Sequence, residues 1–329
     1  MFIAIFNAID SGLIYAIMAL GVYLSFRVLD FPDLTVDGSF VTGAAVAAIA
    51  IIHDVPTVIA TLLAIVAGFL AGCITGILNT KGKINPLLSG ILMMTALYSI
   101  NLRIMGQSNI PLLNQPTVFT QLRGTWGDLG IDQAINNMLI STFGLERTPS
   151  TWSILFVMII ITAIIKLCTD FYLKTEVGLA LRATGDNEKM IRSFSANTDT
   201  LTIIGLGISN ALVALAGGLF AQYGGFADLN MGIGMIVIGL ASVIIGESLF
   251  GTKSIMRTTF AVIVGAVIYR MVVAMALRST FLDTGDMKLI TSVLVITALV
   301  VPKLISTHKE VKRKRKKRLE LQTRLKGEA

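Results

Sequence analysis

Nine apolar segments, separated by short polar connections, run through this chain of 329 residues. They lie at about 4–26, 39–53, 57–78, 86–106, 152–173, 201–222, 232–250, 258–277 and 287–306. A helix needs about 20 mainly apolar residues to cross a bilayer, and it satisfies its backbone hydrogen bonds within one segment. The pattern predicts an all-α polytopic membrane protein with about nine (roughly eight to ten) transmembrane helices. The first segment has no basic leader and exceeds a signal-peptide core in length, so we expect it to be a retained span.

Composition argues against catalysis. Charged residues make up only 14% of the chain and hydrophobic residues 54%, which excludes an ordinary globular enzyme. Cys73 and Cys168 lie inside apolar segments, and the two histidines are His53 and His308, so no metal site is predicted. Residues 246–254, GESLFGTKS, nearly spell a phosphate-binding loop, but they join two apolar segments instead of a strand and a helix. We therefore expect no enzyme activity and no cofactor in this chain.

Positive charge gathers after the last apolar segment. Residues 303–329 hold eleven Lys or Arg against three Glu. Because basic segments stay on the cytoplasmic side, the tail at 307–329 is predicted to be cytoplasmic. Alternate crossings then place residues 176–200 inside and the N-terminus outside. The basic run has no interleaved aromatic residues and follows a span, so we expect it to attract anionic lipid rather than nucleic acid.

Residues 28–46, VLDFPDLTVDGSFVTGAAV, do not have the pattern of a plain helix. Three carboxylates, a proline and a glycine fall within about ten residues of this stretch. Irregular backbone at membrane depth is tolerated where it is buried in protein or lines a wet cavity, so we expect a broken or re-entrant element. The long hydrophilic connection at 107–151 is predicted to lie outside, either as a tolerated insertion or as a surface that meets a substrate-binding protein.

An internal repeat is visible in the sequence. Phe31-Pro32-Asp33-Leu34 recurs as Phe226-Ala227-Asp228-Leu229, and LLSGILMMTAL at 87–97 recurs as LITSVLVITAL at 289–299. The first FxDL follows an inward span and the second an outward span, which predicts two inverted repeats at about 4–106 and 201–306. Inverted repeats with broken helices are typical of transporters, in which the substrate path lies near the midplane between the repeats.

Polar residues in the broken elements and at facing helix starts are candidates to line such a path. They are Asp33, Thr35, Asp37, Ser39, Asn85, Ser89, Asn210, Asp228, Asn230 and Thr291. Asp33 and Asp228 are explained at least as well as helix caps, and Ser89 and Thr291 as small residues that allow close helix packing. Arg270, in the outer part of its span, either holds a substrate carboxylate or pairs with a neighbouring group or lipid headgroup.

The segment 176–200, EVGLALRATGDNEKMIRSFSANTDT, is a polar island between two apolar spans. Asp186 is predicted to cap a short surface helix, Glu188 and Arg192 are spaced to pair at i, i+4, and Asn197 is predicted to end the helix. Its expected apolar ridge consists of Met190, Ile191 and Phe194. One interpretation is an interfacial helix resting on lipid.

The island resembles the cytoplasmic coupling loop of ABC-importer permeases of the branched-chain amino acid, ribose and nucleoside class. The resemblance rests on Gly178, Arg182, Ala183, Gly185, Asn187 and Met190, followed by Ala196-Asn197-Thr198 and an apolar span, and it extends over roughly residues 5–305. In that family the loop docks into a groove of an ATPase, here with residues 186–195. The resemblance implies ATPase-coupling roles for Gly178, Arg182, Gly185, Asp186, Asn187, Glu188, Met190 and Arg192.

The same resemblance implies the partners and the location. ATP and magnesium would be bound by a separate ATPase, in two copies, and a second permease chain, identical or paralogous, would complete the pathway. An external binding protein would deliver the solute across a prokaryotic inner membrane. The sequence mildly favours a branched-chain, hydrophobic or aromatic amino acid over a nucleoside or sugar. An ion-gradient-driven secondary transporter is the alternative, although such a transporter does not need the island.

Overall fold

The computed structural model describes residues 2–127, 131–143, 148, 149, 151–194 and 196–276, together with 289, 292, 293, 296, 297 and 300. Thr291, most of the apolar segment predicted at 287–306, and the basic tail at 307–329 lie outside these described residues. The predicted ninth span and the cytoplasmic position of the tail therefore stay predictions.

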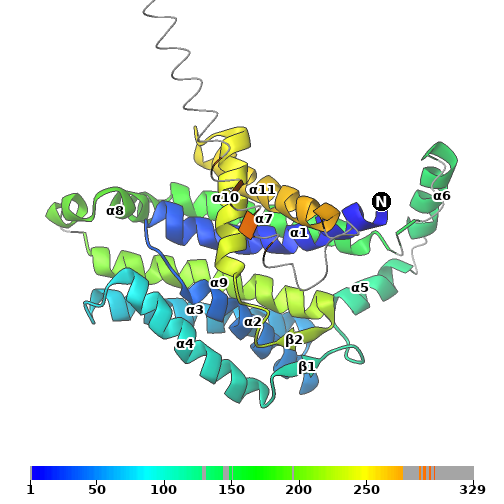
Figure 1. Cartoon of the computed structure of the whole chain (residues 1–329), viewed down its shortest axis with the longest axis horizontal. Coiled ribbons are helices and arrows are strands. Elements are labelled where there is room, and N and C mark those ends of the chain that lie inside the picture. The colour runs from blue at the N-terminus through cyan, green and yellow to red at the C-terminus, as the bar shows by residue number, and fades with distance from the viewer. Residues whose placement is uncertain are drawn as a thin grey trace, which may run out of the picture.

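The described chain is almost entirely helical (Figure 1). Its elements are α1 (Phe2–Tyr23), η1 (Leu24–Val28, a π-helix), α2 (Thr35–Ile52), α3 (Thr57–Thr80), α4 (Pro86–Met105), β1 (Asn109–Pro111), α5 (Val118–Gly127), α6 (Ile131–Phe143), α7 (Ser153–Lys174), α8 (Glu176–Ser193), α9 (Thr198–Gly224), β2 (Phe226–Asp228), α10 (Met235–Phe250) and α11 (Ile255–Ala276). Among the described residues, seven helices are long and apolar enough to cross a membrane, and α10, with 16 residues, is shorter. The predicted all-α membrane class is confirmed.

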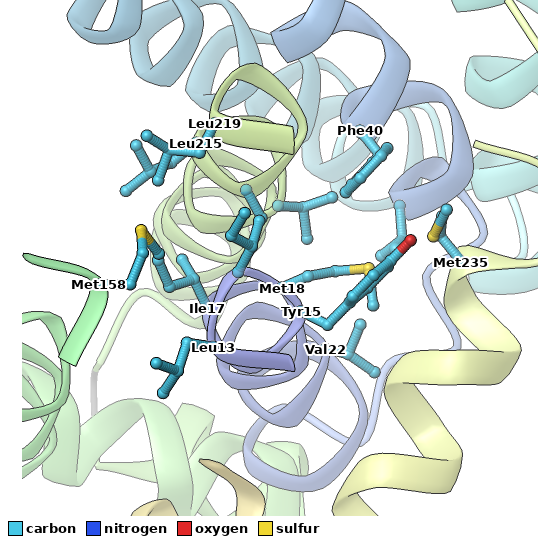
Figure 2. Packing of buried hydrophobic residues seen from close by; sticks show 14 of the residues in the cluster. Leu13, Tyr15, Ile17, Met18, Val22, Phe40, Met158, Leu215, Leu219 and Met235 are labelled. Atoms are coloured by element: carbon cyan, nitrogen blue, oxygen red, sulfur yellow. The ribbon is translucent and has the colours of Figure 1, made fainter. Parts of the chain in front are cut away.

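The centre of the bundle is formed by α9, which packs along both α1 and α2 (Figure 1). Their shared core includes Tyr15, Met18 and Phe40 (Figure 2). The Tyr15 and Phe40 rings stack with centroids 6.4 Å apart, and the Phe220 ring lies 5.3 Å from Tyr15. Because lipid tails are as apolar as these side chains, close packing rather than hydrophobicity holds such helices together.

Small residues bring α2 and α9 into backbone contact. A Cβ atom on Gly43 would collide with the backbone of Ala214, and one on Gly217 would collide with the backbone of Phe40. Small residues at helix interfaces allow this close approach in membranes. The reciprocal glycines therefore fix how α2 lies on α9, and α2 carries several of the candidate path residues.

The outer helices α3, α4 and α7 present apolar side chains outward. Leu62, Leu70, Leu88, Ile160 and Leu167 are all exposed. Contiguous apolar faces of this extent are uncommon on a soluble monomer. They fit contact with lipid or with another membrane subunit.

The predicted break after the first span is present, but its limits differ from the sequence prediction. The helix predicted from residue 39 begins at Thr35, because the Asp33 carboxylate accepts a hydrogen bond from the Thr35 N–H at 2.9 Å. The helix predicted from residue 232 begins at Met235. Figure 1 shows α10 at a steep angle to α1 and α9, so α10 does not run alongside the central helices.

The segment predicted to lie outside, 107–151, contains β1, α5 and α6 in its described parts. β1 pairs antiparallel with β2, with Ile110 opposite Ala227. This short ladder joins the connection after α4 to the connection after α9. The number of spans, the inverted duplication and the outside location stay predictions.

Candidate functional site

The polar island forms a helix, α8, that starts directly after α7. One residue, Thr175, separates the two helices, and its side chain accepts a hydrogen bond from the Gly178 N–H at 3.2 Å. Gly178 packs against the backbone of Tyr172 and Leu173, where a larger residue would collide. The predicted helix is therefore present and fixed at a tight corner, but it begins at Glu176, before the predicted start at Asp186.

One side of α8 packs on the end of the first helix. A Cβ atom on Gly185 would collide with the backbone of Val28, and Leu181 is fully buried in the same contact region. Leu181 and Leu29 both lie against Gly205 of α9. These contacts attach α8 to both η1 and α9.

The helix is kinked at Asn187. Its φ of −160° and ψ of 90° are not helical, and its side chain accepts a hydrogen bond from the Met190 N–H at 3.1 Å. Asn187 therefore caps the second half of α8. The predicted cap, Asp186, is wrong by one residue, because local sequence rules favour aspartate and asparagine almost equally at a cap.

Arg192 ties the second half of α8 to the start of α9. It pairs with Glu188 at 2.9 Å, as the i, i+4 spacing predicted, and also with Asp199 at 2.7 Å. Its Nε donates to the Thr198 hydroxyl at 2.8 Å. Asn197 was predicted to end this helix, but it caps the next one, since its side chain accepts from the α9 backbone.

The opposite side of α8 is exposed. Six of the eight predicted coupling residues are exposed, namely Arg182, Asp186, Asn187, Glu188, Met190 and Arg192. Met190 is 48% exposed and Phe194 74% exposed, whereas Ile191 is only 9% exposed. The predicted apolar ridge therefore contains Met190 and Phe194, and Ile191 faces the protein.

A polar hollow of about 390 Å³ lies beside α8. Arg182 and Asp186 line it from α8, and Lys253 lines it from the turn between α10 and α11. Arg27 of η1 and Glu247 of α10 form an ion pair in the same hollow, with Arg27 Nε 3.0 Å from a carboxylate oxygen. The near match to a phosphate loop at 246–254 thus runs from the end of α10 through the turn that precedes α11, without a strand.

A second group of candidate residues gathers at the break before α2. The Asp33 side chain is fully buried, and its second oxygen accepts a hydrogen bond from the Asn210 amide at 2.6 Å. The hydroxyls of Thr35 and Thr75 are hydrogen-bonded at 2.8 Å beside it. Asn210 lies near the middle of α9, so this polar network is set deep inside the bundle.

Asp37 connects the two broken elements. Its two carboxylate oxygens accept hydrogen bonds from the N–H groups of Gly234 at 2.9 Å and Ile236 at 2.8 Å, which cap α10. A carboxylate at a helix N-terminus is favoured by the helix dipole. Asp37 also lines an apolar cavity of about 280 Å³ between α2, α4 and the segment before α10, with Tyr98 and Asn101.

The remaining path candidates are dispersed. Ser39 and Ser89 are fully buried, and the Ser89 hydroxyl donates to the Pro86 carbonyl within α4. Asn85 is exposed and caps α4, whereas Asp228 and Asn230 lie beyond the far end of α9. The structure therefore brings together Asp33, Thr35 and Asn210, and separates Asn85 from Asp228 and Asn230. Thr291 is not described.

Two polar residues in this region were missed. Thr75 joins the network at Thr35, and Asn101 donates to the Gly38 carbonyl at 3.2 Å while its own carbonyl oxygen is buried without a partner. Both lie inside apolar spans, and a polar side chain in such a span is the sequence signal that would have identified them. Arg270, whose role was left open, lies over the Tyr15 ring at 4.7 Å and donates to Ser11.

A family model described as "Branched-chain amino acid transport system / permease component" matches residues 4–301. The chain belongs to this permease family. The predicted family is thereby confirmed, and with it a multi-pass membrane protein of an ABC import system, whose family works with separate ATPase and substrate-binding proteins. Within the described residues, no group of three or more metal-binding side chains is present.

Individual relatives of the permease carry different names. It is 42% identical to the tyrosine transport system permease protein of Clostridioides difficile (strain R20291) over 300 residues, which cover 91% of this chain and 92% of that protein. It is 26% identical to the ribose import permease protein RbsC of Escherichia coli (strain K12) over 251 residues, 76% of this chain and 71% of that one. The solved structure of PsaBC from Streptococcus pneumoniae in complex with Fab has a TM-score of 0.47 and 14% identity, covering 91% of this chain and 89% of that one.

Proposed function

We propose that the permease forms the translocation pathway of an ATP-driven importer for a hydrophobic or aromatic amino acid, and that α8 couples the pathway to a separate ATPase. In this proposal α8 lies on the cytoplasmic side and the N-terminal end of α1 outside. The chain itself makes and breaks no covalent bond. ATP and magnesium are bound by the partner.

The observation that carries the coupling role is the two-sided character of α8. Its glycines and Leu181 are packed against η1, α7 and α9, so the helix is held by several elements of the bundle. Its other side exposes Asp186, Glu188 and Met190. A helix attached in this way transmits a push from a docked partner to the helices beneath it.

Support for the substrate class comes from the relatives. The protein with 42% identity is named for tyrosine transport, whereas the one named for ribose import has 26% identity. The path in this proposal passes Asp37 and the cavity of about 280 Å³ beside it, which is mainly apolar with a few polar groups. Such a lining suits a small solute with an apolar side chain. Sugar import is the second candidate, on the strength of the ribose relative.

The coupling role is tested by co-purification from detergent-solubilised membranes of cells that contain the complete importer. A variant with Asp186→Ala, Glu188→Ala and Met190→Ala is expected to lose the ATPase, because these side chains supply the exposed charge and apolar contact. Arg192 is left intact, since it ties α8 to α9. Leu179→Ala, exposed on α8 before the kink, is the matched control and should retain the ATPase.

Equal ATPase recovery with the triple variant and the control would contradict the assignment of α8. The substrate class is tested by uptake of labelled L-tyrosine, L-leucine and D-ribose into proteoliposomes that contain the importer, its binding protein and ATP. Amino acid uptake that requires ATP and survives a proton or sodium ionophore is the expected result. ATP-independent uptake abolished by the ionophore would identify a secondary transporter instead.

A further inference from the structure

A separate polar cavity of about 270 Å³ lies at the end of the bundle opposite α8. It is lined by the first turns of α1, by α5, by the connection before α7 with the start of α7, and by the end of α9. Figure 1 shows the N-terminal end of α1 beside α5, far from α8. None of the predicted coupling or path residues lines this cavity.

The inner wall of the cavity holds a carboxylate that is not fully paired. Asp10 is only 3% exposed, and its Oδ1 atom is buried without a hydrogen-bond partner. Buried carboxylates inside membrane helices are costly unless they are paired or wetted, and they mark functional positions. Among the described residues, no basic group forms an ion pair within 4 Å of Asp10. Asp10 therefore presents an open acceptor to whatever enters the cavity.

A basic side chain lines the same cavity. Arg123 of α5 lines the same space, is exposed, and lies close enough for its charge to act on Asp10. The two opposite charges thus face one cavity without being joined, which leaves room between them for a ligand that carries both signs.

Aromatic rings form the apolar part of the lining. Phe6 packs edge-on against Trp152, with centroids 4.8 Å apart, and Tyr223 packs edge-on against Phe119 at 5.8 Å. These supporting contacts hold the two lining rings in place, and edge-on pairs are a favourable arrangement. Ile154 adds an aliphatic surface from α7.

We propose that this cavity binds a free α-amino acid as its zwitterion, with the ammonium group at Asp10, the carboxylate at Arg123 and an aromatic or large apolar side chain against Phe6 and Tyr223. An arginine guanidinium matches a carboxylate with two parallel hydrogen bonds. The proposal rests on amino acid import as proposed above, and it adds an entry site on the side of the membrane away from the ATPase.

The chemistry of the cavity discriminates between solute classes. A sugar offers neither charge, so it would leave the Asp10 oxygen unpaired, and sites with buried polar groups strongly reject ligands that do not satisfy them. A simple amine would satisfy Asp10 but would lie beside the Arg123 charge. A zwitterion satisfies both groups at once.

The test measures binding to the purified full-length permease in lipid nanodiscs, without ATPase or binding protein. The probes are L-tyrosine, tyramine, which lacks the carboxylate, and 3-(4-hydroxyphenyl)propanoate, which lacks the ammonium group. L-Tyrosine should bind most tightly. Asp10→Asn should weaken the binding of L-tyrosine and tyramine about tenfold or more and leave the affinity for the propanoate little changed. Arg123→Gln should weaken the binding of L-tyrosine and the propanoate by a similar factor and leave the affinity for tyramine little changed.

Matched controls remove the same charges elsewhere. Asp54→Asn removes an exposed carboxylate in the turn between α2 and α3, and Arg103→Gln removes an exposed arginine on α4, and neither should alter any of the three affinities. Elution profile and apparent melting temperature of each variant report on folding. Variants that melt earlier but bind all three probes as the unaltered permease does would show a purely structural charge pair and overturn the proposal.

The experiments distinguish a failure of the proposed site from a failure of the proposed function. Amino acid uptake by the full importer together with probe affinities that ignore Asp10 and Arg123 would remove the site and leave the proposed function. The stated affinity pattern in the isolated permease, with no amino acid uptake by the full importer, would support the site and overturn the proposed function. Absence of L-tyrosine binding to the unaltered permease would overturn the site.

Discussion

Two segments of the permease share the pattern FxDL, at residues 31–34 and 226–229, and they form the same turn in different surroundings. In each, the aspartate accepts a hydrogen bond from the N–H two residues later, Thr35 at 2.9 Å after Asp33 and Asn230 at 2.7 Å after Asp228. The local sequence is therefore sufficient to form the turn. What differs is everything else that the aspartate touches.

The first aspartate is fully buried and is tied to Asn210, in the middle of α9. The second is half-buried and is the last residue of β2, opposite Asn109 of β1. Its carboxylate accepts a hydrogen bond from the exposed Asn109 amide at 3.3 Å. The comparison teaches that the shared FxDL pattern specifies the local hydrogen bond of the aspartate but not its environment, since residues 226–228 form a strand and residues 31–33 do not. The energetic importance of each aspartate is accordingly expected to follow its long-range partner.

The largest effect is expected for Asp33→Ala. The change leaves the buried Thr35 N–H and one Asn210 amide hydrogen without an acceptor, so the free energy of unfolding should fall by about 2–3 kcal/mol. Unfolding in mixed detergent and SDS micelles measures this. Asp33→Asn keeps an acceptor for Thr35 but places an NH2 group against the Asn210 amide, so it should recover only part of the loss. An Asp33→Ala variant as stable as the unaltered protein would show that the contribution of this aspartate does not depend on its buried partners.

Asp37→Ala is expected to have the next largest effect. It removes the acceptor for two N–H groups at the start of α10, and loss of a helix cap costs about 1–2 kcal/mol. The same unfolding assay measures the change, and hydrogen exchange at Gly234 and Ile236 should increase selectively. Unchanged exchange at these two amides would show that Asp37 does not cap α10 in solution.

Asp228→Ala should destabilise the protein by about 0.5–1 kcal/mol, because water can reach the amide that the half-buried carboxylate leaves. The difference between its loss of unfolding free energy and that of Asp33→Ala reports how much burial adds to the contribution of the aspartate. Equal losses at the two positions would mean that the turn, and not the burial, determines the contribution of the aspartate.

Asn230→Ala should be nearly neutral, within about 0.5 kcal/mol, because the Asp228 turn uses the backbone N–H of residue 230 and the side chain is exposed. Unfolding in the same micelles provides the measurement. A loss as large as that of Asp228→Ala would indicate a side-chain role that the turn does not explain.

Much of the membrane architecture was predictable from hydropathy. The spans predicted at 57–78, 86–106 and 152–173 agree with α3, α4 and α7 to within a few residues, because each is a continuous apolar run bounded by polar residues. The start of α2 was placed too late, since Asp37 counts against a span on a hydropathy scale. In the folded chain its carboxylate accepts hydrogen bonds from N–H groups at the start of α10.

The candidate sites were less predictable, for two reasons. At α8, several polar residues can act as caps, so the rules indicated a helix but placed its cap at Asp186, whereas Thr175 caps the start of α8 and Asn187 caps its second half. Inside the bundle, the partners of Asp33 and Asp37 lie nearly 200 residues away in the sequence, and no local pattern links them. The separation is 177 residues for Asp33 and Asn210.

The single-residue joint at Thr175 has a mechanical consequence. A connection of one residue adds only two rotatable backbone torsions, and Gly178 packs against the backbone of Tyr172 and Leu173. The angle between α7 and α8 is therefore nearly fixed. α7 has 22 residues and is therefore about 33 Å long. In the proposed importer, a tilt imposed on α8 by the ATPase would swing the far end of α7, where Ile154 lines the cavity that holds Asp10. Nucleotide-driven motion on one side of the membrane would then change the shape of the entry site on the other.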